Sequence, residues 1–412
     1  MMVFKKILYK NSLKNCLLLL FILITIIFIL VEIRNGRYWQ SDFEVYYKSA
    51  LRALHGENLY RPDEDQFYRY KYSPAAAYLF IPFLLFSFAK AKFIYSFFLT
   101  FMMYICHILC IKFCYNDLQK MKDLNYKRSI LVFMALILPI LAFYIRELHL
   151  GQVNIILLLL YLLSFYFYRR NLFISALILT LSGFIKPYFI IFIMYFIYEK
   201  QFKYVFYIML SSIIFFFIPF FTYNLSMSIE QNMLWINELK LEILLENNIK
   251  DGRAISIFSL FSKYISFDIF RHKILSHLII LLTCCVFIIS FLRKTAKFLP
   301  RDEKLFYDLS LFCVFIPLLI SNGLNTYVII LPALYIILKN LNKKYHIKIV
   351  IFIISCVFIG FNFTDGGVFT SWIKKLLLLP LGAILLLGVL YSSINKIKDN
   401  DEYVYEKKMN DL

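Results

Sequence analysis

Residues 37–74 read RYWQSDFEVYYKSALRALHGENLYRPDEDQFYRYKYSP and form the first long polar interruption after an apolar segment near the N-terminus. Acidic, basic and aromatic side chains are mixed along this stretch, and Asp42 and Glu44 are its first two acids. Segments that only connect neighbouring helices are usually short. A polar segment of this length predicts a working surface laid against a bilayer, with Asp42 as its leading candidate residue.

The composition is that of a protein with many membrane helices. Of the 412 residues, 61% are hydrophobic and 17% are charged, and the mean hydropathy is +0.71. Soluble domains carry about a quarter charged residues. Apolar runs long enough to cross a bilayer recur from one end of the chain to the other. The predicted fold class is therefore an all-α polytopic membrane protein.

The formal net charge of +19 is compatible with nucleic acid or with anionic lipid as a partner. The basic residues cluster in short tracts between the apolar runs, as expected for the cytoplasmic loops of membrane proteins. Nucleic-acid and dinucleotide signatures are absent from the sequence. We therefore expect membrane lipid, and no nucleic acid, as the partner of these residues.

The eight cysteines all lie in apolar stretches, so no disulfide framework is expected. Cys106, Cys110 and Cys114 share one helix face, with His107 beside them. A metal site is one interpretation of this group. Small residues that pack between membrane helices are the other, and we favour packing.

Charge distribution decides the predicted topology. The basic N-terminal segment precedes an apolar run without a cleavage site, which predicts an uncleaved first helix with a cytoplasmic N-terminus. Residues 74–90 contain Pro74 and Pro82 and are predicted to form a kinked interfacial helix, because a span here would place later basic tracts outside. The predicted spans are 16–33, 93–113, 129–145, 153–168, 172–185, 188–199, 204–222, 274–292, 305–321, 326–339, 348–363 and 374–393.

These twelve spans predict one integral domain, residues 1–395, in the plasma membrane. Residues 396–412 form a charged tail, predicted to be cytoplasmic like the N-terminus. The polar content then accumulates outside, in a first outer loop over 34–92 and a second over 223–272. Both loops are expected to carry interfacial helices, including one over 255–272.

Asp42 is the strongest candidate for chemistry. A carboxylate at a membrane surface can stay ionised near neutral pH and take a proton from a hydroxyl nucleophile. An ordinary solvated loop acid is the alternative. Glu44 lies two residues on and points to another side of the chain if this segment is helical, so it is a supporting residue at best.

A second polar group surrounds Gly151, between two predicted spans. Polar side chains at membrane depth are costly and tend to face a cavity. A tight polar turn would explain the same pattern. The candidates are Arg146, Glu147, His149, Gln152 and Asn154.

Lys186 separates the apolar segments 172–185 and 188–199, each short for a full span, so the pair is either two spans or a re-entrant hairpin. Pro187 breaks the helix directly after the lysine. Lys186 either extends to the interface or offers its charge to a phosphate, which we favour slightly. Arg253 is a second, weaker cation candidate. The sequence contains no P-loop, GxSxG, HExxH or paired CxxC motif.

Four motifs in order resemble glycosyltransferase family 87. They are D-F-x-V-Y-Y at 42–47, F-Y-R-Y-K-Y-S-P at 67–74, L-G-Q-V-N at 150–154 and G-F-I-K-P at 183–187, with Ala50, Gly56 and Tyr60 between the first two. Members of this family are polytopic enzymes with the C-type glycosyltransferase fold. They include mannosyltransferases that use polyprenyl-phosphate mannose.

The resemblance implies a reaction and a set of roles. Asp42 would be the base that activates a hydroxyl of a glycolipid or glycan acceptor. That hydroxyl would attack the anomeric carbon of a hexose, mannose by family association, on a polyprenyl-phosphate donor and invert it. Phosphate binding would fall to Lys186, Arg146 and Arg253, without a metal or cofactor. The residues expected to line the cavity are Glu44, Tyr46, Glu147, His149, Gln152, Asn154 and Asn325.

The late outer loop departs from the family pattern, because S-N-G-L-N-T-Y at 321–327 contains no histidine. This difference leaves the sugar and the acceptor open. A transporter or flippase of polyisoprenoid-linked glycans is the alternative function. Transporters usually place polar residues near the midplane of the membrane, often in two related halves. The polar residues here gather in the predicted outer loops instead, which favours the transferase.

Overall fold

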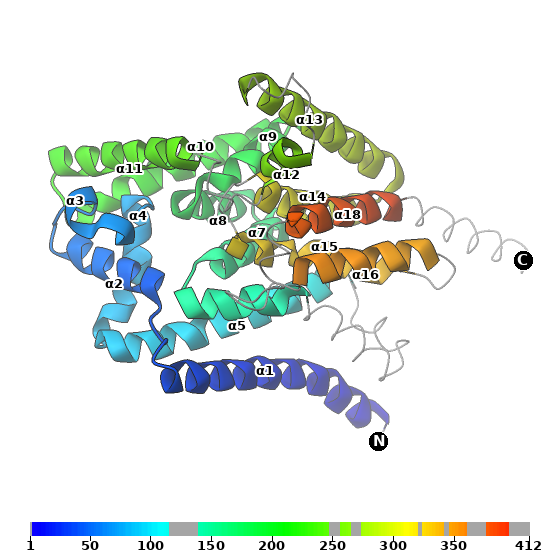
Figure 1. The fold of residues 1–412 in the computed structure, drawn as a ribbon, viewed down its shortest axis with the longest axis horizontal. Helices are drawn as coiled ribbons and strands as arrows, with labels where there is room; N and C mark the ends of the chain where they lie inside the picture. Colours follow the sequence, from blue (N-terminus) through cyan, green and yellow to red (C-terminus); the bar gives the residue numbers. More distant parts are fainter. Residues whose placement is uncertain are drawn as a thin grey trace, which may run out of the picture. The chain divides into compact units, whose positions relative to one another are not determined.

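The computed structural model describes residues 2–114, 139–246, 256–264, 273–319, 324–341, 346–360 and 376–394. Every regular element in these ranges is a helix (Figure 1). The chain divides into two compact units, one of Met1–Leu109 with Tyr144–Asn248 and one of Cys110–Phe143 with Ile249–Leu412. The predicted all-helical class is therefore confirmed over the described residues.

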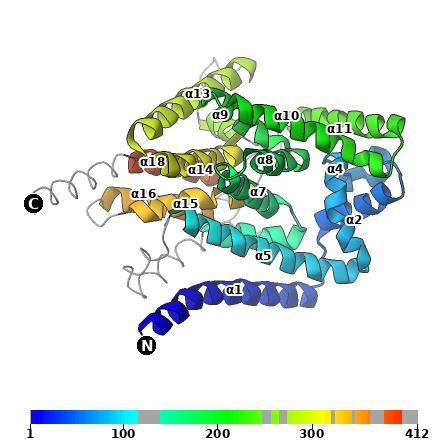
Figure 2. The same ribbon diagram turned by 180° about the vertical axis from the view of Figure 1, so that it is seen from behind.

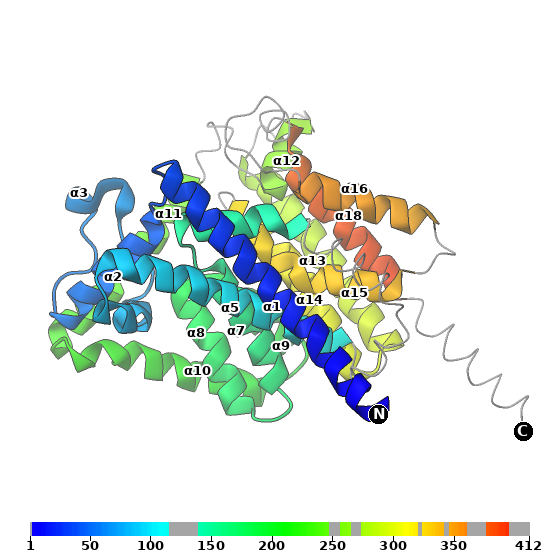
Figure 3. The same ribbon diagram turned by 90° about the horizontal axis from the view of Figure 1, so that it is seen from below.

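The first unit contains the long polar stretch and the helices that follow it. Within this unit, α1 packs along α5 (Figure 3), and the buried hydroxyls of Thr25 and Thr100 lie 2.7 Å apart between them. The described helices of this unit include α1 (Met2–Arg34), α2 (Ser41–Leu54), α3 (Pro62–Asp65), α4 (Pro74–Ala77), α5 (Phe88–Cys114), α7 (Asn154–Phe167), α8 (Leu172–Ile185), α9 (Ile190–Tyr198), α10 (Phe202–Phe217) and α11 (Leu225–Glu246), and most of the helix Pro139–Leu150. The last residues of α5 belong to the second unit.

The second unit is built around α14, whose side chains are buried from Leu305 to Leu318. A helix with apolar side chains all round is stable only when other helices cover it. The described helices of this unit are α12 (Ile257–Tyr264), α13 (Lys273–Phe298), α14 (Arg301–Leu319), η8 (Leu324–Ile330), α15 (Leu331–Asn340), α16 (His346–Gly360) and α18 (Leu378–Ser393).

Four described helical segments are long and apolar enough to cross a membrane: Leu17–Arg34, Phe88–Cys114, Phe202–Phe221 and His277–Phe298. A fifth would be the pair Pro139–Leu150 and Asn154–Phe167, which is bent by 116° at its break. Over the described residues, the protein is therefore helical and has the long apolar helices of a membrane protein. Each of the twelve predicted spans coincides with a helix over its described residues, but their number as spans stays a prediction.

The segment predicted as a kinked interfacial helix over 74–90 is helical up to Leu85 but changes helix type. Ser73 caps α4 by accepting a hydrogen bond from the Ala76 amide, and a 3-10 helix with Pro82 inside it follows over Tyr78–Leu85. This segment ends before α5 begins at Phe88. Seen from both sides, α2 and α4 lie next to each other (Figures 1 and 2). The polar stretch thus folds back on itself and presents α2 to the rest of the first unit.

Candidate active site around Asp42

Helix α2 carries Asp42 in its first turn. Asp42 and Glu44 at the start and Arg52 at the end complement the helix dipole, and Gly56, with φ +69°, follows the C-terminus. Phe43 anchors the helix, since it is fully buried and stacks on Tyr95 with ring centres 4.2 Å apart. This anchor leaves Asp42 on the neighbouring face of α2, only partly exposed.

Glu44 points away from Asp42, as helical geometry requires. Its carboxylate pairs with Lys48 at 2.7 Å, and both side chains are largely exposed. Tyr46, four residues after Asp42, lies on the same helix face as Asp42 instead. Its hydroxyl is 2.8 Å from that of Tyr72, and Tyr46 is almost completely buried. Tyr46 and Tyr72 thus form an aromatic wall next to Asp42.

The turn at Gly151 brings Gln152 to Asp42. Gly151 has φ +70°, and a Cβ atom here would lie 2.6 Å from the Cβ of Phe43. Only glycine allows this close approach of the turn to α2. The side-chain amide of Gln152 then donates a hydrogen bond to Oδ2 of Asp42. Oδ1 of Asp42 has no hydrogen-bond partner among the described residues, so it is the oxygen that can take up a proton.

Glu147 stabilises this turn. It is fully buried, and its carboxylate accepts hydrogen bonds from the backbone amides of Asn154 (2.9 Å) and Ile155 (3.3 Å). These amides belong to the first turn of α7, which has no intrahelical partners for them. The Asn154 side chain donates to the other carboxylate oxygen at 2.7 Å. Glu147 therefore holds the helix start from which Gln152 reaches Asp42.

Lys186 enters the same group from the end of α8. Its backbone is extended (φ −142°, ψ 133°) because the ring of Pro187 disfavours helical geometry at the preceding residue. Its ammonium group donates to Oδ1 of Asn154 at 3.0 Å. The predicted lysine–proline break is confirmed. Glu147, Asn154 and Lys186 thus form one chain of hydrogen bonds beside Asp42.

Lys71 was not among the predicted site residues. The backbone amide of Ser73 donates to the carbonyl of Phe184 at 3.1 Å and so ties the segment before α4 to the end of α8. Both Lys71 and Lys186 then act electrostatically on Asp42. The only sequence signal was the position of Lys71 inside the F-Y-R-Y-K-Y-S-P motif.

The surroundings of Asp42 raise the pKa of its carboxyl group above the usual 3.8, and burial is the main cause. The charge of Lys186, the hydrogen bond from Gln152 and the charge of Lys71 offset part of this effect. A carboxylate with a raised pKa is a stronger base than an exposed aspartate. The site therefore combines a base with two lysines that suit an anionic ligand.

The remaining predicted site residues are His149, Arg146, Asn325 and Arg253. Nδ1 of His149 is 2.8 Å from Glu32, and its ring lies near Phe28 and Trp39, which places it against α1. Arg146 precedes Glu147 in its helix, so its side chain leaves about 100° round the axis from that of Glu147. Asn325 belongs to the second unit, with its Oδ1 atom buried. Arg253 lies outside the described residues.

A resident metal has no evident ligand set in the described part of the chain, where no three His, Cys, Asp or Glu side chains come together. Cys106 and His107 are fully buried in α5, and His107 lies against the ring of Phe21 at 5.1 Å. This environment agrees with packing between helices.

The chain matches a known protein family. The profile of glycosyltransferase family 87 matches residues 70–321, more than half of the chain. The matched region begins after Asp42 and includes Lys71, Gln152 and Lys186. No curated protein matches the chain.

Proposed function

Because the chain belongs to glycosyltransferase family 87, we propose that it is an inverting hexosyltransferase that uses a polyprenyl-phosphate sugar. Mannose is the first candidate for the sugar, and a hydroxyl of a glycolipid or glycan is the acceptor. The proposal includes twelve spans in the C-type fold, with both units in one integral domain. The site then faces outward from the plasma membrane, with both termini in the cytoplasm.

The observation that carries this proposal is the pairing of Asp42 with Gln152 beside Lys186. Gln152 orients the carboxylate, and Oδ1 accepts the proton of the acceptor hydroxyl as its oxygen bonds to the anomeric carbon. The bond from that carbon to the phosphate oxygen breaks, and the lipid phosphate leaves with the electron pair. Attack from the face opposite the phosphate inverts the anomeric centre.

The cations in this proposal hold the phosphate. Lys186 offers a compact positive charge that suits a lipid phosphate. Its hydrogen bond to Asn154 places this charge close to Asp42. Arg146 and Arg253 are additional phosphate ligands in the proposal. Tyr46, Asn154 and Asn325 line the cavity in the proposal, and Glu147 holds the turn that carries Gln152. Glu44 and His149 instead pair with Lys48 and Glu32.

The base assignment is tested by transfer from radiolabelled polyprenyl-phosphate mannose, with the purified full chain in lipid and a glycolipid extract as acceptor. Asp42→Asn keeps the shape of the side chain and removes the base, so turnover should fall by about 10²–10⁴-fold. Asp63→Asn is the matched control, because Asp63 is exposed and should tolerate the change. If Asp42→Asn turned over as fast as the native protein, the assignment of Asp42 as the base would be wrong. Movement of labelled lipid across the bilayer without transfer would favour a flippase.

Replacing Lys186 tests the phosphate role separately. Lys186→Ala removes a charged hydrogen bond, which contributes about 1.5–3 kcal/mol. The donor should therefore bind roughly 10- to 100-fold more weakly. Equilibrium binding of polyprenyl phosphate to the full chain in lipid measures this loss, and Lys200→Ala, exposed after α9, is the control. Equal affinity of the native protein and Lys186→Ala would contradict the role.

A further inference from the structure

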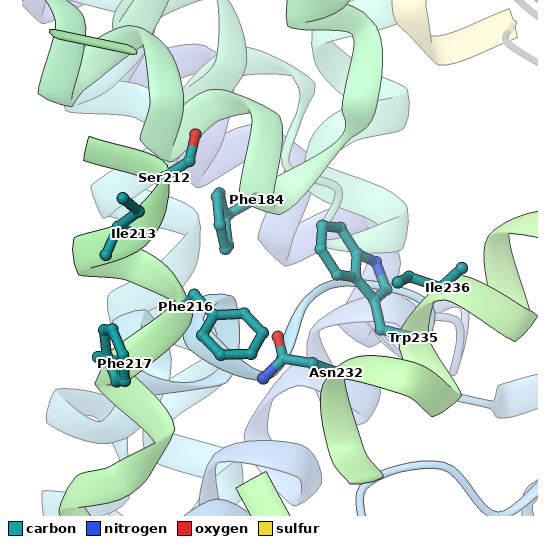
Figure 4. Close-up of a pocket in the computed structure, with 8 residues that line it drawn as sticks. All are labelled: Phe184, Ser212, Ile213, Phe216, Phe217, Asn232, Trp235 and Ile236. Atoms are coloured by element: carbon teal, nitrogen blue, oxygen red, sulfur yellow. The ribbon is translucent and has the colours of Figure 1, made fainter. Parts of the chain in front are cut away.

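An apolar groove of about 380 Å³ lies in the first unit, between α10, α11 and the end of α8 (Figure 4). The rings of Phe184, Phe216 and Trp235 and the amide of Asn232 surround it in the close-up, with Ile213 and Phe217 along α10. None of the residues that line it is charged. Its chemistry therefore suits a hydrocarbon and not the sugar itself.

One side of the groove lies on a membrane-facing helix. Helix α10 is part of the segment Phe202–Phe221, which is apolar enough to cross a bilayer. Ile213 and Phe217 line the groove and are 54% and 53% exposed. Exposed side chains of this kind contact lipid when a helix crosses the membrane. A chain that lies in the bilayer can therefore enter the groove from this side.

The groove residue Phe184 lies close in the chain to Lys186, the lysine proposed to bind the donor phosphate. Phe184 packs against Trp235 and Phe215, with ring centres 5.6 Å and 5.3 Å away. Phe184 lies in the last turn of α8 and Lys186 follows after Ile185 as its C-cap, so the Cα atoms of Phe184 and Lys186 are roughly 5–6 Å apart. One continuous segment thus contributes Phe184 to the groove and Lys186 to the Asp42 site.

We propose that this groove seats the first isoprene units of the lipid-linked donor. The inference rests on the proposed function, because it takes the donor phosphate to lie at Lys186. The branched, rigid isoprene units would pack against the aromatic rings, and the remaining chain would leave past Ile213 into the bilayer. Trp235 would be a contact residue for the donor lipid at the end of the groove nearest the phosphate.

Trp235 provides a direct readout of occupancy. The chain has three tryptophans, so the double substitution Trp39→Phe and Trp372→Phe leaves Trp235 as the only one. The full chain in lipid nanodiscs would be titrated with polyprenyl phosphate that carries a nitroxide on its first isoprene units. The fluorescence of Trp235 should be quenched in a saturable way and recover when unlabelled polyprenyl phosphate is added.

A matched pair of substitutions identifies the groove. Ile213→Tyr fills it and should weaken the quenching titration roughly 5- to 150-fold, because overfilling a packed site is unfavourable. Ile214→Tyr is the control, since Ile214 is 42% exposed on the same helix and does not line the groove. Equal titrations of the two variants would overturn the proposal.

Two further outcomes separate this inference from the proposed reaction. Equal quenching by a phospholipid with the nitroxide on its acyl chain, without competition by polyprenyl phosphate, would show a general lipid surface and overturn the inference. Sugar transfer without quenching would contradict the binding of the donor lipid in the groove, but it would not contradict the proposed transferase activity. Saturable quenching in a protein that transfers no sugar would support the groove and refute the transferase.

Discussion

At the scale of single residues, the two carboxylate oxygens of Asp42 have different surroundings. Gln152 occupies one carboxylate oxygen, and the other has no hydrogen-bond partner in the described ranges. Burial raises the pKa of Asp42, and the charges of Lys186 and Lys71 offset part of this effect. A lysine that balances a base in this way should influence the pH dependence of the reaction.

We predict that Lys71→Met shifts the acidic limb of the kcat/KM profile to higher pH. The charge of Lys71 lowers the pKa of Asp42, so its removal raises that pKa further, and Asp42 becomes ionised only at higher pH. The pH profile of kcat/KM reports the free enzyme and measures this shift. Lys48→Met is the control, because Lys48 is exposed and pairs with Glu44. An unchanged pH profile would contradict an electrostatic effect of Lys71 on Asp42.

At the scale of secondary structure, the polar groups of the site lie at helix breaks. The 116° bend around Gly151 presents Gln152, and the break at Pro187 presents Lys186. A break exposes backbone groups that are costly to leave unpaired in a membrane. Glu147 binds the amides of Asn154 and Ile155, and Ser73 binds the carbonyl of Phe184. Both breaks are therefore stabilised by the same contacts that arrange the site.

Gly151→Ala should damage both the fold and the activity. A positive φ costs a non-glycine residue about 1–2 kcal/mol, and the new methyl group would in addition push the turn away from Phe43. The hydrogen bond from Gln152 to Asp42 would then be lost. Gly36→Ala has a similar positive φ with no atom within 4 Å, so it should lose stability alone. Thermal unfolding and transfer rates measure the two effects, and equal activity losses in both variants would contradict this account.

At the scale of the whole molecule, the chain forms two compact units, and the residues described around Asp42 all belong to the first. Asn325, expected in the cavity from the resemblance, belongs to the second. Its contribution to the site therefore stays a prediction. The orientation of the chain follows from the distribution of basic residues and can be measured directly.

The predicted topology places Asp63 outside and Arg169 inside the cell. In a variant without the native cysteines, Asp63→Cys should react with a membrane-impermeant maleimide in intact cells, because Asp63 is exposed in the first outer loop. Arg169→Cys, exposed after α7, should react only after the membrane is opened. The reverse pattern would contradict the predicted orientation.

The sequence by itself determined the helical class of the described residues and several of the helix breaks, but not the long helix α11 in the second polar segment. Apolar run length and proline chemistry act locally, so the kink after Pro74 and the break at Lys186 could be read from neighbouring residues. Asp42 could be singled out by its setting in a long polar segment. The same local information predicted that Glu44 would point away from it.

Tertiary structure alone decided which of the candidates meet. Gln152 reaches Asp42 across 110 residues of sequence, while His149, three residues before Gln152, pairs with Glu32. Lys71 joins the site because Ser73 binds the end of α8, and the groove beside Lys186 exists only where α10 and α11 pack together. Side-chain partners depend on how distant helices pack, and the local pattern of a sequence does not contain that information.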